Sequence, residues 1–173
     1  MAAPHRVALL GPECTGKTTL ARVLAAATGG VWVPEAARLV AEATPGGLGP
    51  HTVEPIAQLA IALDDAARAG ATRTLVLDTD LVSTVVYARH YYGDCPAWIV
   101  EAARARRADR YLVCVPDLPW VSDGVRDRPD ARQTLLASCL DALDAIGARP
   151  AMVSGTGAGR LAAARAALGR AGA

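Results

Sequence analysis

The sequence predicts an α/β fold in which five parallel strands form one sheet with helices on both faces. Two observations support this prediction: short apolar runs recur along the chain, and the longer stretches between them carry apolar residues at three- and four-residue spacing. Strands that alternate with amphipathic helices indicate βαβ units and a buried parallel sheet. The chain has 173 residues, the usual size of one domain, so we expect residues 1–173 to form a single domain.

The strands are expected at five short runs that are rich in β-branched residues or leucine. They are Val7–Leu10, Val31–Val33, Thr74–Leu77, Tyr111–Val115 and Ala151–Val153.

Helices are expected between these runs, with clear apolar periodicity in residues 20–27, 56–63 and 136–143. Residues that favour helix ends support this reading. Pro55, Pro96 and Pro129 suit first turns, Asp80 suits an N-cap, and Gly93 and Gly147 suit helix stops.

The composition argues against several classes of partner. The net charge is only +1, which leaves no excess of positive charge to bind nucleic acid. The four cysteines are far apart and form no zinc or disulfide pattern, as is usual in a reducing compartment. No apolar run approaches the length of a signal peptide core or a membrane span. We therefore expect a cytoplasmic protein that binds neither nucleic acid nor membrane.

A phosphate-binding motif follows the first predicted strand. Residues 11–18, here called the phosphate loop, read GPECTGKT and fit the pattern GxxxxGK[ST] at the start of an amphipathic helix. Gly11 and Gly16 permit a turn whose backbone N–H groups face a phosphate, and the helix adds its positive N-terminal dipole. Lys17 is expected to reach the β- and γ-phosphates of ATP, and Thr18 to bind Mg²⁺.

Lysine occurs at only one position, Lys17, whereas 17 arginines supply the other basic side chains. A compact ammonium is thus favoured at this position, as it is inside a phosphate-wrapping loop. We expect the neighbouring Glu13, Cys14, Thr15 and Thr19 to border the nucleotide as well. Cys14 is interpreted as a small filler residue, with redox sensing as the alternative.

Two carboxylates follow the third predicted strand. Asp78 ends the run Thr74–Asp78, where an aspartate that binds Mg²⁺ is expected in such enzymes. Asp80 either caps the helix that begins at Leu81 or faces the same cleft as a substrate ligand or base.

After the second strand, Glu35 and Arg38 lie three residues apart, on neighbouring turns if a helix begins at Pro34. They are either a surface ion pair or substrate residues, with Glu35 accepting a proton or binding a sugar hydroxyl and Arg38 anchoring it.

The segment 116–130 after the fourth strand is loop-like and carries Arg126 and Arg128. We interpret it as a lid whose arginines contact the transferring phosphate, the alternative being solvated surface arginines. Trp120 and the pair Tyr91 and Tyr92 could stack on a planar substrate ring or pack in the fold. After the fifth strand, Arg160 and the glycine-rich residues 154–159 could frame the adenine.

Five segments together resemble the ribosylnicotinamide kinase domain of the NadR-type proteins of NAD biosynthesis, a group with a P-loop nucleoside-kinase-like fold. They are Gly11–Leu20 (GPECTGKTTL), Val33–Arg38 (VPEAAR), Leu77–Thr84 (LDTDLVST), Tyr91–Gly93 (YYG) and Pro119–Arg126 (PWVSDGVR).

The resemblance implies ATP-dependent phosphorylation of the 5′-hydroxyl of nicotinamide riboside to give nicotinamide mononucleotide. It places Lys17, Thr18 and Asp78 with ATP and Mg²⁺. Glu35, Arg38, Asp80 and Asp123 fall on the substrate side, and Arg126 in the lid. Bifunctional relatives carry an adenylyltransferase domain before the kinase. This chain begins almost at the phosphate loop, so we expect the kinase activity alone.

Glu35 is our first choice for the carboxylate that orients the attacking hydroxyl, and Asp80 is the second. Two other functions remain open from sequence. One is a kinase for another nucleoside or small metabolite, because phosphate-binding residues do not select the acceptor. The other is an ATP-binding regulatory switch with slow turnover. The oligomeric state is also left open.

Overall fold

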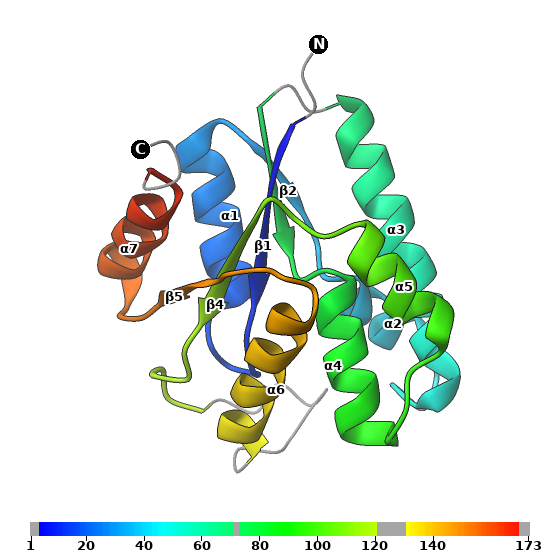
Figure 1. Ribbon diagram of the computed structural model, residues 1–173. Coiled ribbons are helices and arrows are strands. Elements are labelled where there is room, and N and C mark those ends of the chain that lie inside the picture. Colours follow the sequence, from blue (N-terminus) through cyan, green and yellow to red (C-terminus); the bar gives the residue numbers. More distant parts are fainter. Residues whose placement is uncertain (1–3, 71–72, 121–130, 170–173) are drawn as a thin grey trace.

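The predicted fold is confirmed by the computed structural model, which describes residues 4–70, 73–120 and 131–169 (Figure 1). All five predicted runs form strands, although the first begins earlier and the fourth is shifted by one residue. The strands are β1 (His5–Leu10), β2 (Val31–Val33), β3 (Thr74–Asp78), β4 (Arg110–Cys114) and β5 (Ala151–Val153).

The strands form one parallel sheet in the order β2-β3-β1-β4-β5. Strand β1 lies at the centre, and its residues Val7–Leu10 are completely buried. Alternate side chains point to opposite faces of a strand, and both faces of β1 carry apolar residues. Val7 and Leu9 pack in one core, Ala8 and Leu10 in the other.

Helices cover both faces of this sheet (Figure 1). The core that contains Val7 and Leu9 is closed by α1 and α7, and the other by α3, α4, α5 and α6. The helices are α1 (Lys17–Thr28), α2 (Ala36–Ala43), α3 (Val53–Gly70), α4 (Leu81–Tyr92), α5 (Ala97–Ala105), α6 (Arg132–Ala145) and α7 (Gly157–Gly169), with a 3₁₀ turn, η1 (Pro50–Thr52), before α3.

The connections from β1 and β3 leave the sheet on opposite faces. Helix α1 leads from β1 to the edge strand β2, whereas α4 and α5 lead from β3 across to β4. Ligands of open parallel sheets bind at such a switch point, outside the carboxyl ends of the strands. The phosphate loop lies at this place.

Most predicted helix ends are confirmed. Asp80 caps α4 through a hydrogen bond from the Val82 backbone N–H, and Gly93 ends that helix in a left-handed conformation. Gly147 follows α6 with a positive φ, and Pro55 lies in the first turn of α3.

Three positions differ from expectation or lie outside the structure. Pro96 precedes α5 as its cap residue, and α2 begins at Ala36 rather than at Pro34 because Glu35 keeps an extended backbone. Pro129 lies outside the described residues. Among the helices of the described ranges, none is both long and apolar enough to span a bilayer.

A comparison of two glycine substitutions tests the packing behind the phosphate loop. Gly11 has φ +138°, and an added Cβ would lie 2.5 Å from the Cys114 carbonyl oxygen, whereas Gly29 has φ +62° and free space around it. We expect Gly29→Ala to lower the free energy of unfolding by about 1 kcal/mol, the cost of a left-handed residue. Gly11→Ala should cost roughly 2–4 kcal/mol, because it adds a backbone clash. Equal losses in denaturant unfolding without nucleotide would contradict this packing.

Candidate active site

The phosphate loop joins β1 to α1 and leaves the amide groups at the helix start available. Gly16, in a left-handed conformation, is the N-cap residue of α1 and provides no side-chain cap. The first N–H groups of a helix have no intrahelical partners, so here they are available for an anion. The buried Thr15 hydroxyl donates a hydrogen bond to the Pro12 carbonyl and stabilises the turn.

Lys17 turns back over the loop from the start of α1. Its Nζ atom donates hydrogen bonds to the carbonyl oxygens of Gly11 at 3.0 Å and Pro12 at 2.7 Å. These contacts hold the ammonium beside the first residues of the loop. Thr18 and Thr19 follow in the first turn of α1.

Asp78 is next to the phosphate loop because β3 pairs with β1, in a register that places Leu9 opposite Asp78. Its side chain is buried, and neither carboxylate oxygen accepts a hydrogen bond of good geometry. The pKa of Asp78 is raised from 3.8 to about 6, mainly by burial and to a smaller extent by the nearby Glu35. The Thr18 hydroxyl, Lys17 and Arg38 oppose the shift.

These residues fit a Mg²⁺ ion bound together with nucleotide phosphates. Mg²⁺ prefers oxygen ligands and is usually held by one or two protein groups, with phosphate oxygens and water completing its shell. Asp78 offers two buried oxygens without partners, and the Thr18 hydroxyl interacts with the same carboxyl group. Within the described residues there is no cluster of three or more His, Cys, Asp or Glu side chains that could hold a metal alone.

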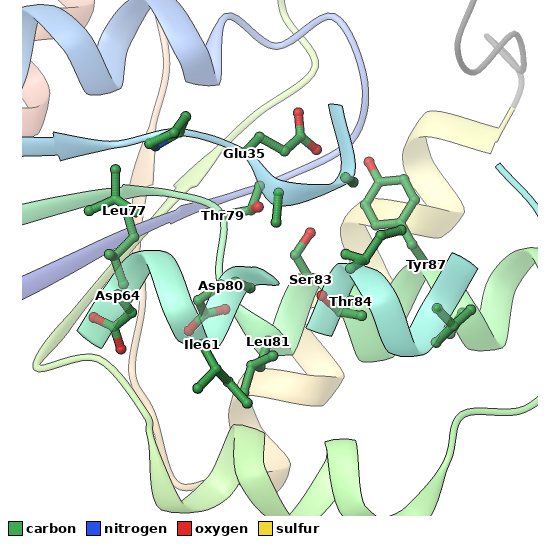
Figure 2. Close-up of a pocket in the computed structure, with 18 of the residues that line it drawn as sticks. Glu35, Ile61, Asp64, Leu77, Thr79, Asp80, Leu81, Ser83, Thr84 and Tyr87 are labelled. Atoms are coloured by element: carbon green, nitrogen blue, oxygen red, sulfur yellow. The ribbon is translucent and has the colours of Figure 1, made fainter. Parts of the chain in front are cut away.

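A pocket opens beside the loop, between the end of β2 and helices α3 and α4; we call it the α3–α4 pocket (Figure 2). The empty space between its side chains amounts to about 840 Å³, a volume that includes open solvent at the mouth. The polar side chains of Glu35, Ser83 and Tyr87 lie toward one end of the pocket and point into it (Figure 2). Apolar side chains form much of the remaining wall, among them Val33, Val53, Ile56, Ile61, Leu77 and Leu81.

Glu35 lies at the N-cap position of α2 but caps no backbone N–H group. Its carboxylate is 4.0 Å from Nε of Arg38, the outer limit of an ion pair, and is far less exposed than that guanidinium. Glu35 lines the α3–α4 pocket, whereas Arg38 is not among the lining residues. Both the ion-pair and the substrate interpretation of this pair thus remain compatible with the structure.

Asp80 lines the same pocket, but both of its carboxylate oxygens are engaged. One accepts the cap bond from Val82, and the other accepts a hydrogen bond from the Tyr111 hydroxyl at 2.8 Å. Burial raises the pKa of Asp80 above its usual value. The capping role is confirmed, and these two bonds limit the capacity of Asp80 to accept a proton from a substrate.

Buried charges close the end of the pocket away from Glu35 (Figure 2). The guanidinium of Arg6 forms a two-point contact with Asp64, at 3.2 and 2.8 Å, and donates to the carbonyls of residues 106 and 107. Arg106 and Arg68 also contact Asp64. This ion network joins β1 to α3 and to the end of α5, so it fixes the floor of the pocket.

Of the remaining predicted site residues, three lie in the described part of the chain and three lie outside it. Arg160 is buried and bonds to Asp117 and to the carbonyls of Val115 and Gly155, so it links the segments after β4 and β5. Tyr92 lines the α3–α4 pocket and is 37% exposed, and Trp120 is half-buried. Asp123, Arg126 and Arg128 lie outside the described residues, as does most of the proposed lid.

Sequence reasoning did not identify Arg132, the first residue of α6. Its guanidinium donates to the carbonyls of Cys14 and Leu118, and its buried Nε has no hydrogen-bond partner. No carboxylate forms an ion pair with Arg132 in the described part of the chain. A signal was present, because Arg132 follows two other arginines of the proposed lid at short intervals.

Comparisons with known proteins agree with this architecture. A family model described as an AAA domain matches residues 6–160. The chain belongs to this family. No significant match was found among curated protein sequences.

Solved structures show that this AAA domain has the fold of P-loop kinases. It superposes on a NadR protein in complex with NR with a TM-score of 0.73 and 23% identity, covering 96% of this chain and 51% of that one. A NadR protein in complex with NAD and AMP-PNP gives 0.73 and 21%, with coverages of 96% and 50%. The chain thus spans about half the length of these NadR chains. Thymidylate kinase from Ehrlichia chaffeensis gives 0.61 and 13%, covering 95% of this chain and 99% of that one.

The buried Asp78 predicts a specific dependence of stability on pH. Its pKa is about 6 in the folded protein, against 3.8 for a solvent-exposed aspartate, so the folded state binds the proton more tightly. Stability from this group is therefore present at low pH and is lost as pH rises from about 4 to 6. Without metal or nucleotide, the free energy of unfolding of Asp78→Asn at pH 8 should exceed that of the wild type by up to roughly 3 kcal/mol. At pH 4 the two proteins should be about equally stable in denaturant unfolding.

The same variant should lose Mg²⁺-dependent nucleotide binding, because a neutral amide is a poorer ligand for this ion. A less stable Asp78→Asn protein at pH 8 would show that the ionised carboxylate is satisfied in the apo fold, contrary to its lack of partners.

Proposed function

We propose that this chain is an ATP-dependent kinase that phosphorylates the 5′-hydroxyl of nicotinamide riboside to give nicotinamide mononucleotide. The observation that carries the proposal is the position of the α3–α4 pocket beside the phosphate loop, with Glu35 among the polar groups at its opening and an apolar interior. This arrangement suits an acceptor with a planar ring and a hydroxylated sugar. Similarity to NadR chains, one of which is in complex with NR, supports the choice of acceptor.

In this mechanism the chain mainly positions two substrates and stabilises charge. The phosphate loop and Lys17 bind the β- and γ-phosphates of ATP. Thr18 and Asp78 would hold Mg²⁺, which neutralises charge on the phosphate oxygens when it is bound. Glu35 orients the 5′-hydroxyl and takes its proton as the new P–O bond forms. The bond from the γ-phosphorus to the β-phosphate oxygen breaks, and ADP leaves.

A kinase for another nucleoside or a small metabolite is the second candidate. The similarity to thymidylate kinase favours it, because the same fold serves a different acceptor there. The residues of the phosphate loop do not distinguish between acceptors, so only the α3–α4 pocket can decide.

Release of ADP from Mg-ATP in the presence of a panel of nucleosides tests the proposal, with Lys17→Ala as the inactive reference. We expect nicotinamide riboside to stimulate ADP release and the Lys17→Ala protein to remain folded but inactive. Stimulation by a different nucleoside alone would retain the kinase and replace the acceptor. ATP binding without stimulation by any acceptor would favour the regulatory switch, and near-normal turnover by Lys17→Ala would contradict the assignment of the loop.

A pair of variants distinguishes the two candidate bases. Glu35→Gln should lower kcat by about 10²- to 10⁴-fold, the usual contribution of a positioned general base, and leave the melting temperature nearly unchanged. Asp80→Asn should instead lower the melting temperature, because Asp80 caps α4 and accepts the Tyr111 bond. If Glu35→Gln kept its kcat and folded Asp80→Asn lost it, the role of base would belong to Asp80.

A further inference from the structure

Glu13 places a carboxylate inside a loop that is built to bind phosphates. The residue is only 6% exposed, so water screens its charge poorly. A carboxylate near bound phosphates weakens their binding by like-charge repulsion. No lysine, arginine or histidine forms an ion pair with Glu13 in the described residues. The position therefore needs an explanation other than direct nucleotide binding.

The partner of Glu13 is a residue of the α3–α4 pocket. The hydroxyl of Tyr91 donates a hydrogen bond to Oε1 of Glu13 at 3.0 Å, whereas Oε2 is buried without a hydrogen-bond partner. A buried unsatisfied oxygen destabilises the fold, and the hydrogen bond from Tyr91 offsets part of this cost at Glu13. This hydrogen bond thus connects a side chain of the phosphate loop to α4.

Tyr87 repeats this arrangement one helical turn earlier. Its hydroxyl lies 3.4 Å from the Gly11 carbonyl oxygen, and its ring stacks on that of Tyr91 with centroids 6.1 Å apart. Both tyrosines line the α3–α4 pocket. The same two side chains therefore form part of the pocket wall and contact the first residues of the phosphate loop.

We propose that the Tyr91–Glu13 hydrogen bond couples the two substrate sites, so that acceptor and nucleotide each bind more tightly when the other is present. Glu13 is a positioning residue that acts through Tyr91. An acceptor packed on the Tyr91 ring restricts it, which fixes Glu13 and the start of the loop. A nucleotide then binds to a loop that is already ordered, which raises its affinity. By linkage, a bound nucleotide raises the affinity for the acceptor by the same factor. The proposal rests on the kinase function above.

The test measures the dissociation constant of the proposed acceptor, nicotinamide riboside, by calorimetry. It is measured with and without Mg²⁺ and a non-hydrolysable ATP analogue. The wild type should bind the acceptor at least about 5-fold more tightly with the analogue, the lower end of typical coupling. Tyr91→Phe, which keeps the ring but loses the donor, should reduce this ratio toward one. Glu13→Gln keeps an oxygen that accepts the bond, so it should retain the ratio and bind the analogue at least as tightly as the wild type.

Tyr92→Phe is the matched control, because it removes a hydroxyl from the same pocket and leaves both tyrosine contacts to the loop. Tyr92→Phe should keep the wild-type ratio of acceptor dissociation constants without and with the analogue, even if its affinity for either ligand changes. A merely structural role of Tyr91 would weaken both ligands and leave the ratio unchanged.

Three results would overturn the inference: a wild-type ratio near one, a Tyr91→Phe ratio equal to that of the wild type, or much weaker analogue binding by Glu13→Gln. A wild-type protein that binds no nucleoside of the panel would instead overturn the proposed function, and the inference with it. The two failures are thus distinguishable by wild-type acceptor binding alone.

Discussion

The parallel pairing of β1 with β3 on one side and β4 on the other is the constraint on which the site depends. Hydrogen bonds fix the register of these strands, so their carboxyl ends meet at one edge of the sheet. The phosphate loop, Asp78 and the segment after β4 follow from these ends. Because β1 is buried on both faces, the loop begins from a rigid base, and the close approach of Gly11 to Cys114 fixes the position of its first residue.

Departures from ordinary folding rules gather at this edge. Among the described residues, four of the six buried side-chain polar atoms without a hydrogen-bond partner belong to Glu13, Asp78 and Arg132, and the other two are Trp32 Nε1 and Arg160 Nε. Cys14 and Thr79 have positive φ angles, which side-chain-bearing residues rarely adopt. Unsatisfied polar groups cost about 1–3 kcal/mol each, so a fold selected for stability alone would avoid them. Their concentration around one loop is what a preorganised binding site requires.

The sequence predicted those features that depend on local pattern. Apolar runs fixed the five strands, and the spacing of GxxxxGK[ST] located the phosphate loop and its helix. The expectation that Asp78 binds Mg²⁺ rested on the strand that precedes it, whereas its position beside the loop depends on the pairing of β3 with β1. Asp80 was predicted as a cap or a substrate residue, and the cap was confirmed because its hydrogen bond to Val82 spans only two residues.

Contacts between distant segments could not be predicted in this way. The order of the strands, the Tyr111–Asp80 bond and the contacts of Arg6 and Arg106 with Asp64 join residues that are at least 31 positions apart. Glu13 was placed with the nucleotide because its neighbours in sequence bind phosphate, whereas its contact with Tyr91 is visible only in three dimensions. Local pattern thus predicted the residues of the phosphate loop, whereas the pocket beside it is visible only in the structure.

Lys17 gives the chain an unusual chemical simplicity. With 17 arginines and one lysine, the protein has a single side-chain amine, and that amine is held between two carbonyls of the phosphate loop. In other proteins, acylation or alkylation of amines yields a mixture of surface adducts. Here, apart from the chain terminus, any such reaction falls on the phosphate-binding site, so the extent of modification reports directly on the occupancy of that one position.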